Sequence, residues 1–345
     1  MFFVDKTNFI KEWWKNRDVV TLITRPRRFG KTLNMSMLDC FFSNKYASRA
    51  DLFEGLSIWQ DEEYRKLQGT YPVIFLSFAA VKAGNLEDAK AQIKQEIARL
   101  YRENRNLMKE DIFGEGEREL YYRTTVKMDD VTAQDSLRNL SEWMERYYGK
   151  KAIILLDEYD TPMQEAYMQG YWDEFTSFVR SLFNASFKTN PYLERAIMTG
   201  ITRVSKESIF SDLNNLQVVT TTSDLYADCF GFTETEVFQA LDEFGMGDKK
   251  DEIKKWYDGF TFGEHRDIYN PWSITNYLDK RKIYPYWAST SSNGLVSRLI
   301  RTASADVKEK MEDLLRGQTI TVNFDEQIVY NQLDDNEEAI WSLLL

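Results

Sequence analysis

The chain has 345 residues and carries 55 acidic against 44 basic side chains, which gives a net charge of −11 at pH 7. This length allows one large or two medium domains, and the negative balance argues against nucleic-acid binding by the body as a whole, although it leaves direct binding by this chain open. We find neither a run that approaches the length of a membrane span nor a signal-peptide pattern. Cys40 and Cys229 lie in apolar patterns typical of core thiols in a reducing compartment, so we expect a cytoplasmic protein.

Residues 3–7 read Phe-Val-Asp-Lys-Thr and precede a helical pattern at 8–15. Asp5, Lys6 and Thr7 either line the adenine side of a nucleotide pocket or form a turn that caps this helix. We favour the capping interpretation.

The first strong motif lies between an apolar strand at 19–24 and a helix at 32–42, where residues 25–32 read Arg-Pro-Arg-Arg-Phe-Gly-Lys-Thr. A phosphate-binding loop requires this strand–loop–helix context, because its backbone N–H groups and the following helix N-terminus point at the phosphates. We expect Lys31 to reach the β- and γ-phosphates of ATP, and the Thr32 hydroxyl to bind Mg²⁺. The residues expected to contact the nucleotide are Arg27, Arg28, Phe29, Gly30, Lys31 and Thr32.

The loop departs from the usual motif at one position. The pattern G-x-x-x-x-G-K-[ST] has glycine where this sequence has Arg25, and glycine there supplies a backbone conformation that other residues resist. Pro26 fixes φ and can stiffen the loop instead. The alternative is a surface turn with solvated arginines, but the flanking strand and a second motif favour the phosphate loop.

The next elements alternate between strand and helix. We expect a strand at 71–78 and a long amphipathic helix at 86–107, with one apolar stripe and a solvated charged face. The charged, glycine-containing segment 113–130 predicts a mobile insertion, and a helix at 137–148 leads into the following strand.

The second motif is the apolar run at 152–156 that ends in Asp157 and Glu158. Such a run predicts a strand buried on both faces of a parallel sheet. In P-loop ATPases, a carboxylate in the place of Asp157 holds Mg²⁺, and one in the place of Glu158 polarises the attacking water as general base. A strand followed by a polar turn is the alternative. An acidic residue directly after the metal-binding aspartate favours hydrolysis over phosphoryl transfer.

A helix at 171–187 and strands at 194–201 and 216–221 follow. Strands separated by helices imply a parallel sheet with right-handed crossovers, so the predicted fold is an α/β P-loop NTPase core over residues 1–222.

Polar residues at the end of the fourth strand are candidates for a γ-phosphate sensor. Thr199 or Thr202 could contact the γ-phosphate or the attacking water, and Arg203 could neutralise transition-state charge in its own or a neighbouring subunit. Equally, Arg203 could be a structural cation that pairs with Asp212 or with neighbours of Asp157.

Residues 223–345 predict a smaller, mostly helical domain. Its expected helices are 233–244, with a Thr233–Glu236 capping box, 249–257, one beginning at Pro271, 294–302 and 306–316, followed by a strand at 318–324. The aromatic stretch 256–263 either covers a bound nucleotide or fills the core of this domain. His265 is expected in an exposed turn without a catalytic role.

The chain resembles the AAA-ATPase-like family of bacterial proteins, in which an ATPase domain usually precedes a PD-(D/E)XK nuclease-like domain. The resemblance rests on the motifs at 3–7, 25–32, 156–160, 199–203, 257–260 and 269–273. In this family arginine is the expected residue at position 25. Members usually carry a short extra segment before the first of these motifs, which is nearly absent here.

The last residues, 339–345, resemble the start of an apolar helix without a stop signal. The resemblance implies that this segment leads into the nuclease-like domain. Residues 252–254 read Glu-Ile-Lys and fit part of the nuclease motif, but they lie in a helical, charged pattern, so we expect no nuclease site here. The chain is then the ATPase part of a longer protein or the product of a truncated gene.

Three functions compete at this stage. The first is an ATP-hydrolysing switch, alone or as a homo-oligomer, that controls an attached or partner effector such as a nuclease. The second is a nucleotide-binding interaction module without hydrolysis, and the third is a P-loop kinase. Intact Lys31, Thr32, Asp157 and Glu158 favour the first, and the sequence shows no acceptor site of a kinase.

Overall fold

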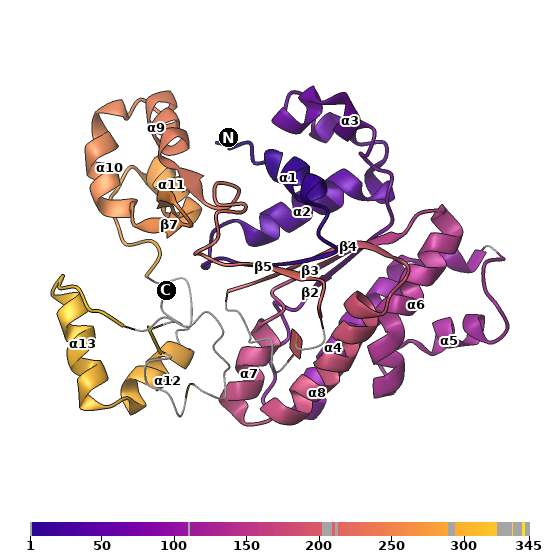
Figure 1. Cartoon of the computed structure of the whole chain (residues 1–345). Helices are drawn as coiled ribbons and strands as arrows, with labels where there is room; N and C mark the ends of the chain where they lie inside the picture. The colour runs from indigo at the N-terminus through magenta and orange to yellow at the C-terminus, as the bar shows by residue number, and fades with distance from the viewer. Residues whose placement is uncertain are drawn as a thin grey trace.

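A five-stranded parallel sheet forms the centre of the N-terminal two-thirds of the chain in this computed structural model (Figure 1). The structure describes residues 2–109, 111–201, 209–210, 213–288, 294–322, 333 and 340–341. The strands lie in the order β2-β3-β4-β1-β5, with these bounds: β1 (Val20–Thr24), β2 (Val73–Ser77), β3 (Ala152–Asp157), β4 (Leu193–Gly200) and β5 (Leu216–Val219). The predicted α/β P-loop NTPase fold is confirmed.

Helices cover both faces of this sheet (Figure 1). One face carries α1 (Asn8–Asn16), α2 (Lys31–Phe42) and α3 (Glu62–Arg65), and the other carries α4 (Leu86–Glu103), α6 (Asp130–Tyr148), α7 (Thr161–Gln169) and α8 (Trp172–Phe183). Because side chains alternate along a strand, Leu22 packs into one hydrophobic core and Ile23 into the other. Burial on both faces explains why the strands read as continuous apolar runs.

The segment 113–130, predicted as a mobile insertion, contains a packed helix instead. Helix α5 (Glu117–Arg123) buries Tyr121, whose hydroxyl donates a hydrogen bond to Tyr101 O at 2.6 Å. Helix α6 also begins earlier than predicted, because the Asp129 side chain accepts a hydrogen bond from Thr132 N and caps it at Asp130. The prediction was wrong because the charged composition outweighed two local signals, the apolar Tyr121 and the N-cap Asp129.

Helix α2 contains a half-buried carboxyl group, Asp39, that gives a stability prediction. Burial raises the pKa of Asp39 to about 6, although Lys45 opposes the shift. The folded state therefore binds more protons than the unfolded state between about pH 4 and pH 6, and the cost of burying the charge is complete only above the folded-state pKa. We expect Asp39→Asn to raise the free energy of unfolding at pH 7 by about 1–3 kcal/mol and to leave it nearly unchanged at pH 4.

Urea unfolding at both pH values measures this effect, with exposed Asp248→Asn as the matched control. An equal change at pH 4 and pH 7 would show that the gain does not come from the Asp39 charge.

A three-stranded antiparallel sheet with three helices follows the core (Figure 1). We call residues 232–280 the small-sheet unit. Its elements are β6 (Phe232–Thr233), α9 (Glu234–Glu243), α10 (Lys250–Tyr257), β7 (Phe260–Phe262), β8 (His265–Tyr269) and α11 (Pro271–Lys280), with the strand order β6-β8-β7. The predicted capping box is present, because Thr233 Oγ1 accepts from Glu236 N and the Glu236 carboxylate accepts from Thr233 N.

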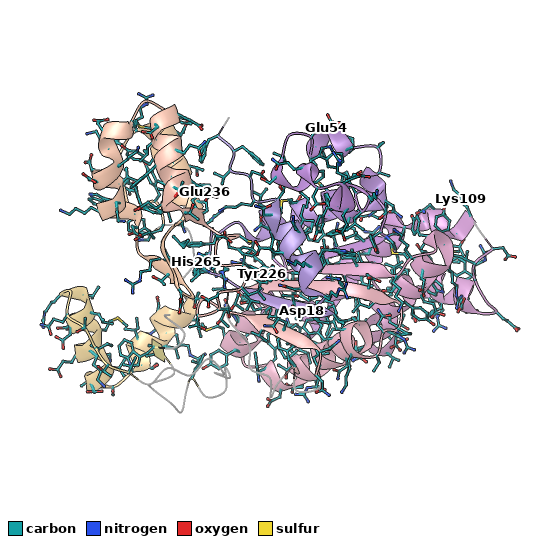
Figure 2. The ribbon with its side chains drawn as sticks, turned by 45° about the horizontal axis from the view of Figure 1, so that its top comes forward. Asp18, Glu54, Lys109, Tyr226, Glu236 and His265 are labelled. Atoms are coloured by element: carbon teal, nitrogen blue, oxygen red, sulfur yellow. The ribbon has the colours of Figure 1, made fainter. Side chains whose placement is uncertain are left out.

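The β7–β8 hairpin was not predicted from the sequence. Phe262 pairs with His265 across a two-residue turn that begins at Gly263, whose φ of 55° lies in the left-handed region. A glycine after the Phe-Thr-Phe run at 260–262, followed a few residues later by Ile268 and Tyr269, was the available signal. His265 is exposed on this hairpin, as predicted (Figure 2).

Helices α12 (Gly294–Thr302) and α13 (Ala305–Leu315) lie close to their predicted bounds. The strand predicted at 318–324 is wrong over residues 318–322, which are irregular, and residues 323–324 lie outside the described part of the chain. Of the expected apolar helix at 339–345, only 340–341 are described, and both are helical. Within the described residues, every helix is too short or too polar to cross a membrane.

Candidate functional site

The carboxyl ends of three adjacent strands bring the two sequence motifs together. β1 leads into the phosphate loop (residues 25–32), β3 ends at Asp157, and β4 lies between these two strands and ends at Gly200. Ligands of open parallel sheets bind at the carboxyl ends of the strands. The order of the strands thus places Lys31, Thr32, Asp157 and Glu158 at one edge.

The backbone of the predicted phosphate loop turns sharply ahead of helix α2. Arg28 and Gly30 have φ values of 68° and 83°, so the chain turns sharply through the left-handed region before α2 begins at Lys31. Lys31 Nζ donates to Arg25 O at 2.8 Å and to Pro26 O at 2.9 Å, which closes the loop over its own lysine. Burial lowers the pKa of the Lys31 amine to about 8, against the attraction of nearby Asp160, Glu158 and Asp157.

Two hydroxyl groups hold the Asp157 carboxylate from opposite sides. Thr32 Oγ1 donates to Asp157 Oδ2 at 2.7 Å, and Thr199 Oγ1 donates to Asp157 Oδ1. Asp157 is almost fully buried, whereas Thr32 is exposed on the cavity side. A threonine hydroxyl and a carboxylate are hard oxygen ligands, so this pair fits Mg²⁺. Of the two sensor candidates, Thr199 contacts the site, and Thr202 lies outside the described residues.

Glu158 lies beside this pair in a left-handed conformation, with φ of 51°. Its backbone N–H donates to Thr199 Oγ1 at 3.4 Å, and its carboxylate accepts a hydrogen bond from Thr161 Oγ1 at 3.1 Å. These contacts hold the side chain at the wall of a cavity that Lys31 and Thr32 also line. Carboxylate, ammonium and hydroxyl groups therefore face one space.

The cavity has a volume of about 520 Å³, which is within the range of small-molecule sites. Part of its wall comes from residues that the sequence did not single out: Lys82, Gln164, Glu165, Met168 and Leu295. Three of these lie on α7, which begins four residues after Asp157 and has proline in its first turn. That proline was the available signal for α7, which the sequence did not predict.

The other predicted contact residues have different positions. Arg27 and Arg28 line the cavity, and the Arg28 guanidinium also stacks on Trp272 at 4.8 Å. The Phe29 side chain is buried away from the cavity, so only its backbone is available to phosphate. Arg203, the predicted transition-state cation, and Asp212 lie outside the described residues.

Residues 5–7 form the predicted turn before α1. Asp5 accepts hydrogen bonds from Thr7 N and from Ser57 N and Oγ, and Lys6 donates to Glu236 at 2.7 Å (Figure 2 shows Glu236 on α9). None of these three side chains is among the residues that line the described cavity. Their contacts favour the capping interpretation over a role at the adenine.

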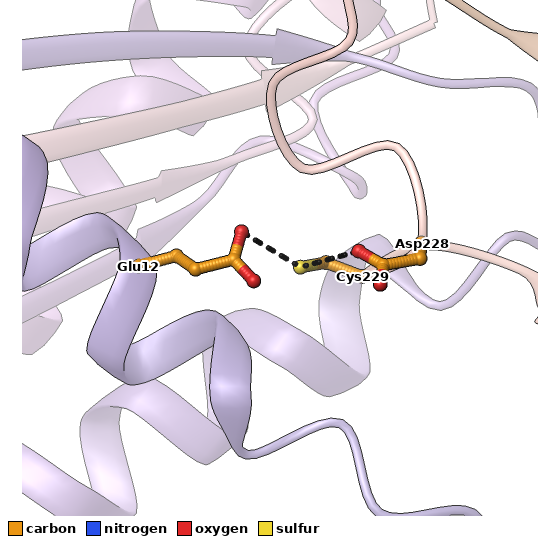
Figure 3. A group of neighbouring side chains, drawn as sticks. All are labelled: Glu12, Asp228 and Cys229. Carbon is orange, nitrogen blue, oxygen red and sulfur yellow. Dashed lines mark hydrogen bonds between the residues drawn. The ribbon is translucent and has the colours of Figure 1, made fainter. Parts of the chain in front are cut away.

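Glu12, Asp228 and Cys229 form a second cluster of polar side chains (Figure 3). Cys229 Sγ lies 3.7 Å from one oxygen of each carboxylate. Burial, together with these two charges, raises the pKa of the thiol well above its usual value. A protonated thiol that donates to carboxylates explains the cluster, and a thiolate metal ligand is disfavoured. Cys40 and Cys229 are both free thiols.

Residues 1–210 match the model of the family described as predicted AAA-ATPase. The chain belongs to this family. The uncharacterized protein in the vnfD 5′ region of Azotobacter chroococcum mcd 1 is 28% identical over 296 residues, which are 84% of this chain and 51% of that protein. The chain thus spans about half the length of this curated relative. Membership of the family supports nucleotide binding.

Among solved structures, a signal transduction ATPase with numerous domains and a tetratricopeptide repeat sensor, from Pyrococcus horikoshii, matches with a TM-score of 0.36 and 14% identity. The match covers 99% of this chain and 38% of the other.

Proposed function

We propose that the chain binds Mg·ATP in this cavity and hydrolyses it, and that the cycle acts as a switch for an attached or partner effector. The observation that carries the proposal is the Thr32–Asp157–Thr199 hydrogen-bonded set, which shares a cavity edge with Lys31 and Glu158. A metal-binding pair, a phosphate-binding lysine and a candidate base are the parts that P-loop ATPases require.

The steps follow from the positions of these side chains. Lys31 leaves the carbonyls of the loop and contacts the β- and γ-phosphates, where its charge stabilises the transferred group. Thr32 and Asp157 would hold Mg²⁺, which would supply further neutralisation of phosphate charge. Glu158 accepts a proton from a water molecule whose oxygen attacks the γ-phosphorus, and the bond to the β–γ bridging oxygen breaks to release ADP and phosphate.

Thr199 has a positioning role in this scheme, because its one hydroxyl contacts both Asp157 and the backbone of Glu158. Arg203 remains a proposed transition-state cation, from its own or a neighbouring subunit. Residues 1–222 form the proposed catalytic core, and residues 223–345 the proposed regulatory part, from which Leu295 lines the cavity. The greater length of the curated relative supports an effector domain beyond this segment, for which a nuclease is our proposal.

A non-hydrolysing binding module is the second candidate. The Thr161–Glu158 hydrogen bond favours hydrolysis, because it holds a carboxylate at the cavity wall, where a water molecule has access to it. A module that only binds nucleotide has no need of that arrangement.

We expect wild-type protein to release phosphate from ATP with Mg²⁺ and to stop when the metal is chelated. Thr32→Val removes one proposed metal ligand and should reduce the Mg²⁺-dependent rate by about tenfold or more, on the scale of a lost contact to a charged group. Phosphate release is measured over a Mg²⁺ titration, with Thr275→Val as the control because Thr275 is an exposed helical threonine that is not among the residues lining the cavity.

Release that is insensitive to chelation would contradict the metal assignment. ATP binding by calorimetry without any turnover would instead support the non-hydrolysing module.

A further inference from the structure

Arg25 occupies the position at which phosphate loops usually have glycine, and its side chain has no exposed surface. Nη1 donates to Thr24 O at 3.1 Å and to Thr220 O, and Nη2 donates to Leu225 O at 3.3 Å. The guanidinium also lies 4.6 Å from the centre of the Phe262 ring. Two of these partners belong to the linker at 220–231, and Phe262 belongs to the small-sheet unit.

These contacts compensate the buried charge of Arg25. Burial lowers its pKa to about 10, so the side chain stays cationic at neutral pH. Among the described residues no carboxylate forms an ion pair with Arg25. Carbonyl dipoles and the face of Phe262 therefore compensate its charge. Its Nε has no hydrogen-bond partner among the described residues. Displacing the linker or the hairpin would leave a buried cation without compensation, which is strongly unfavourable.

The backbone of the same residue connects to the nucleotide site. Arg25 N donates to Gly200 O at 3.2 Å, at the end of β4, and Arg25 O accepts from Lys31 Nζ at 2.8 Å. Arg25 therefore contacts β4, Lys31 and the linker to the small-sheet unit.

Phe29 docks the other end of the loop on both the linker and the small-sheet unit. Its ring packs with Ala227, Phe262 and Ile268, and its carbonyl accepts a hydrogen bond from Gly231 N at 3.2 Å. Gly231 has φ of 85°, and a Cβ there would lie 2.9 Å from the Phe29 ring, so this close approach requires glycine.

Two weaker contacts extend the same interface: Arg28 stacks on Trp272, and Asn270 Nδ2 donates to Arg27 O at 3.3 Å. The small-sheet unit and its linker thus contact the loop at Arg25, Arg27, Arg28 and Phe29.

We propose that Arg25 is a positioning residue that couples nucleotide occupancy of the phosphate loop to the small-sheet unit. This inference rests on the proposed function. Phosphate draws Lys31 Nζ away from the carbonyls of Arg25 and Pro26, so binding changes the contacts of the residue whose side chain anchors the linker. By linkage, the free energy by which nucleotide binding shifts the docking of the linker equals the free energy by which that docking changes nucleotide affinity.

Hydrogen exchange of the wild-type protein, with and without Mg·ATP, is the first test. We expect ATP to protect residues 25–32 and also residues 260–269, which form the hairpin. Because this measurement needs no variant, the folding of a mutant does not affect it. Protection of 25–32 with unchanged exchange at 260–269 overturns the proposal.

Arg25→Met is the second test, because methionine removes the charge and the hydrogen bonds but keeps much of the apolar volume. We expect ATP affinity to fall by about 5- to 150-fold, the usual range of coupling between sites, and the ATP-dependent protection of 260–269 to disappear. Arg25→Gly restores the common loop residue. If Arg25 merely replaces glycine, this variant binds ATP at least as well as wild type, whereas positioning through the side chain predicts a loss.

Arg195→Met is the matched control. Arg195 is also buried, donates to Trp13 O and Trp14 O at 2.9 and 2.7 Å, and stacks on Trp14 at 4.2 Å, but it lies near the opposite end of β4. We expect it to lower stability without changing ATP affinity. Equal ATP affinities in Arg25→Met and Arg195→Met overturn the proposal. Wild-type protein that binds no ATP in calorimetry contradicts the proposed function instead.

Discussion

Glu158→Gln should keep ATP bound and slow phosphate release by about 10²–10⁴-fold, the usual contribution of a general base. An amide cannot accept the proton of the attacking water, but it has nearly the same shape and can still accept the hydrogen bond from Thr161. The left-handed backbone at this position has the same cost in both proteins, so the fold should not change. Single-turnover phosphate release measures the chemical step, and calorimetry measures binding.

Glu165→Gln is the matched control for this variant. Glu165 also lines the cavity, but it lies on α7, seven residues after Glu158, and has no contact with the Thr32–Asp157–Thr199 set among the described hydrogen bonds. Its substitution should change the rate by less than about tenfold on this scheme. If Glu165→Gln abolishes turnover and Glu158→Gln does not, the base is on α7.

The sheet, and the edge of it that carries the candidate site, could be predicted because their signals are local. Each buried parallel strand is one apolar run, and the two motifs follow strands whose carboxyl ends must meet at one edge. Helix ends were predictable where a cap is encoded nearby, as at Thr233, and were missed where a charged segment concealed the cap, as at Asp129.

The side chains of the phosphate loop could not be placed in this way. Arg25 and Phe29 belong to the motif by position, yet their side chains contact residues about 200 positions later in the chain. A cation followed by an aromatic residue is equally consistent with phosphate binding. Only the long-range docking of the small-sheet unit distinguishes an anchor from a ligand, and no local pattern encodes it. Similarly, α7 and Lys82 line the cavity through tertiary packing alone.

The aromatic residues of the small-sheet unit pack in two different places. Its aromatic residues were expected either to cover the nucleotide or to fill their own core. Phe262 instead packs against the Arg25 guanidinium and the Phe29 ring, whereas Tyr257 and Tyr277 pack within the unit. One part of the aromatic stretch therefore contacts the phosphate loop from outside the cavity, and the other stabilises the unit that presents it.

Lys31→Ala should weaken ATP binding by roughly tenfold to a hundredfold, because it removes a charge-assisted contact worth about 1.5–3 kcal/mol. The loss should be greater for ATP than for ADP, since Lys31 is expected to contact both the β- and the γ-phosphate. In the nucleotide-free protein the substitution also leaves the carbonyls of Arg25 and Pro26 without the ammonium that they now bind. Calorimetry with both nucleotides measures the difference.

Lys82→Ala controls for the general effect of removing a positive charge from the cavity wall. Lys82 lines the same cavity but is exposed, whereas Lys31 is buried and held by two loop carbonyls. An exposed cation gains little from a distant phosphate in water, so its loss should change ATP affinity by only a few-fold. Equal affinities of wild type and Lys31→Ala for ATP would exclude the loop as the phosphate site, and a larger effect of Lys82→Ala would move the triphosphate toward α7.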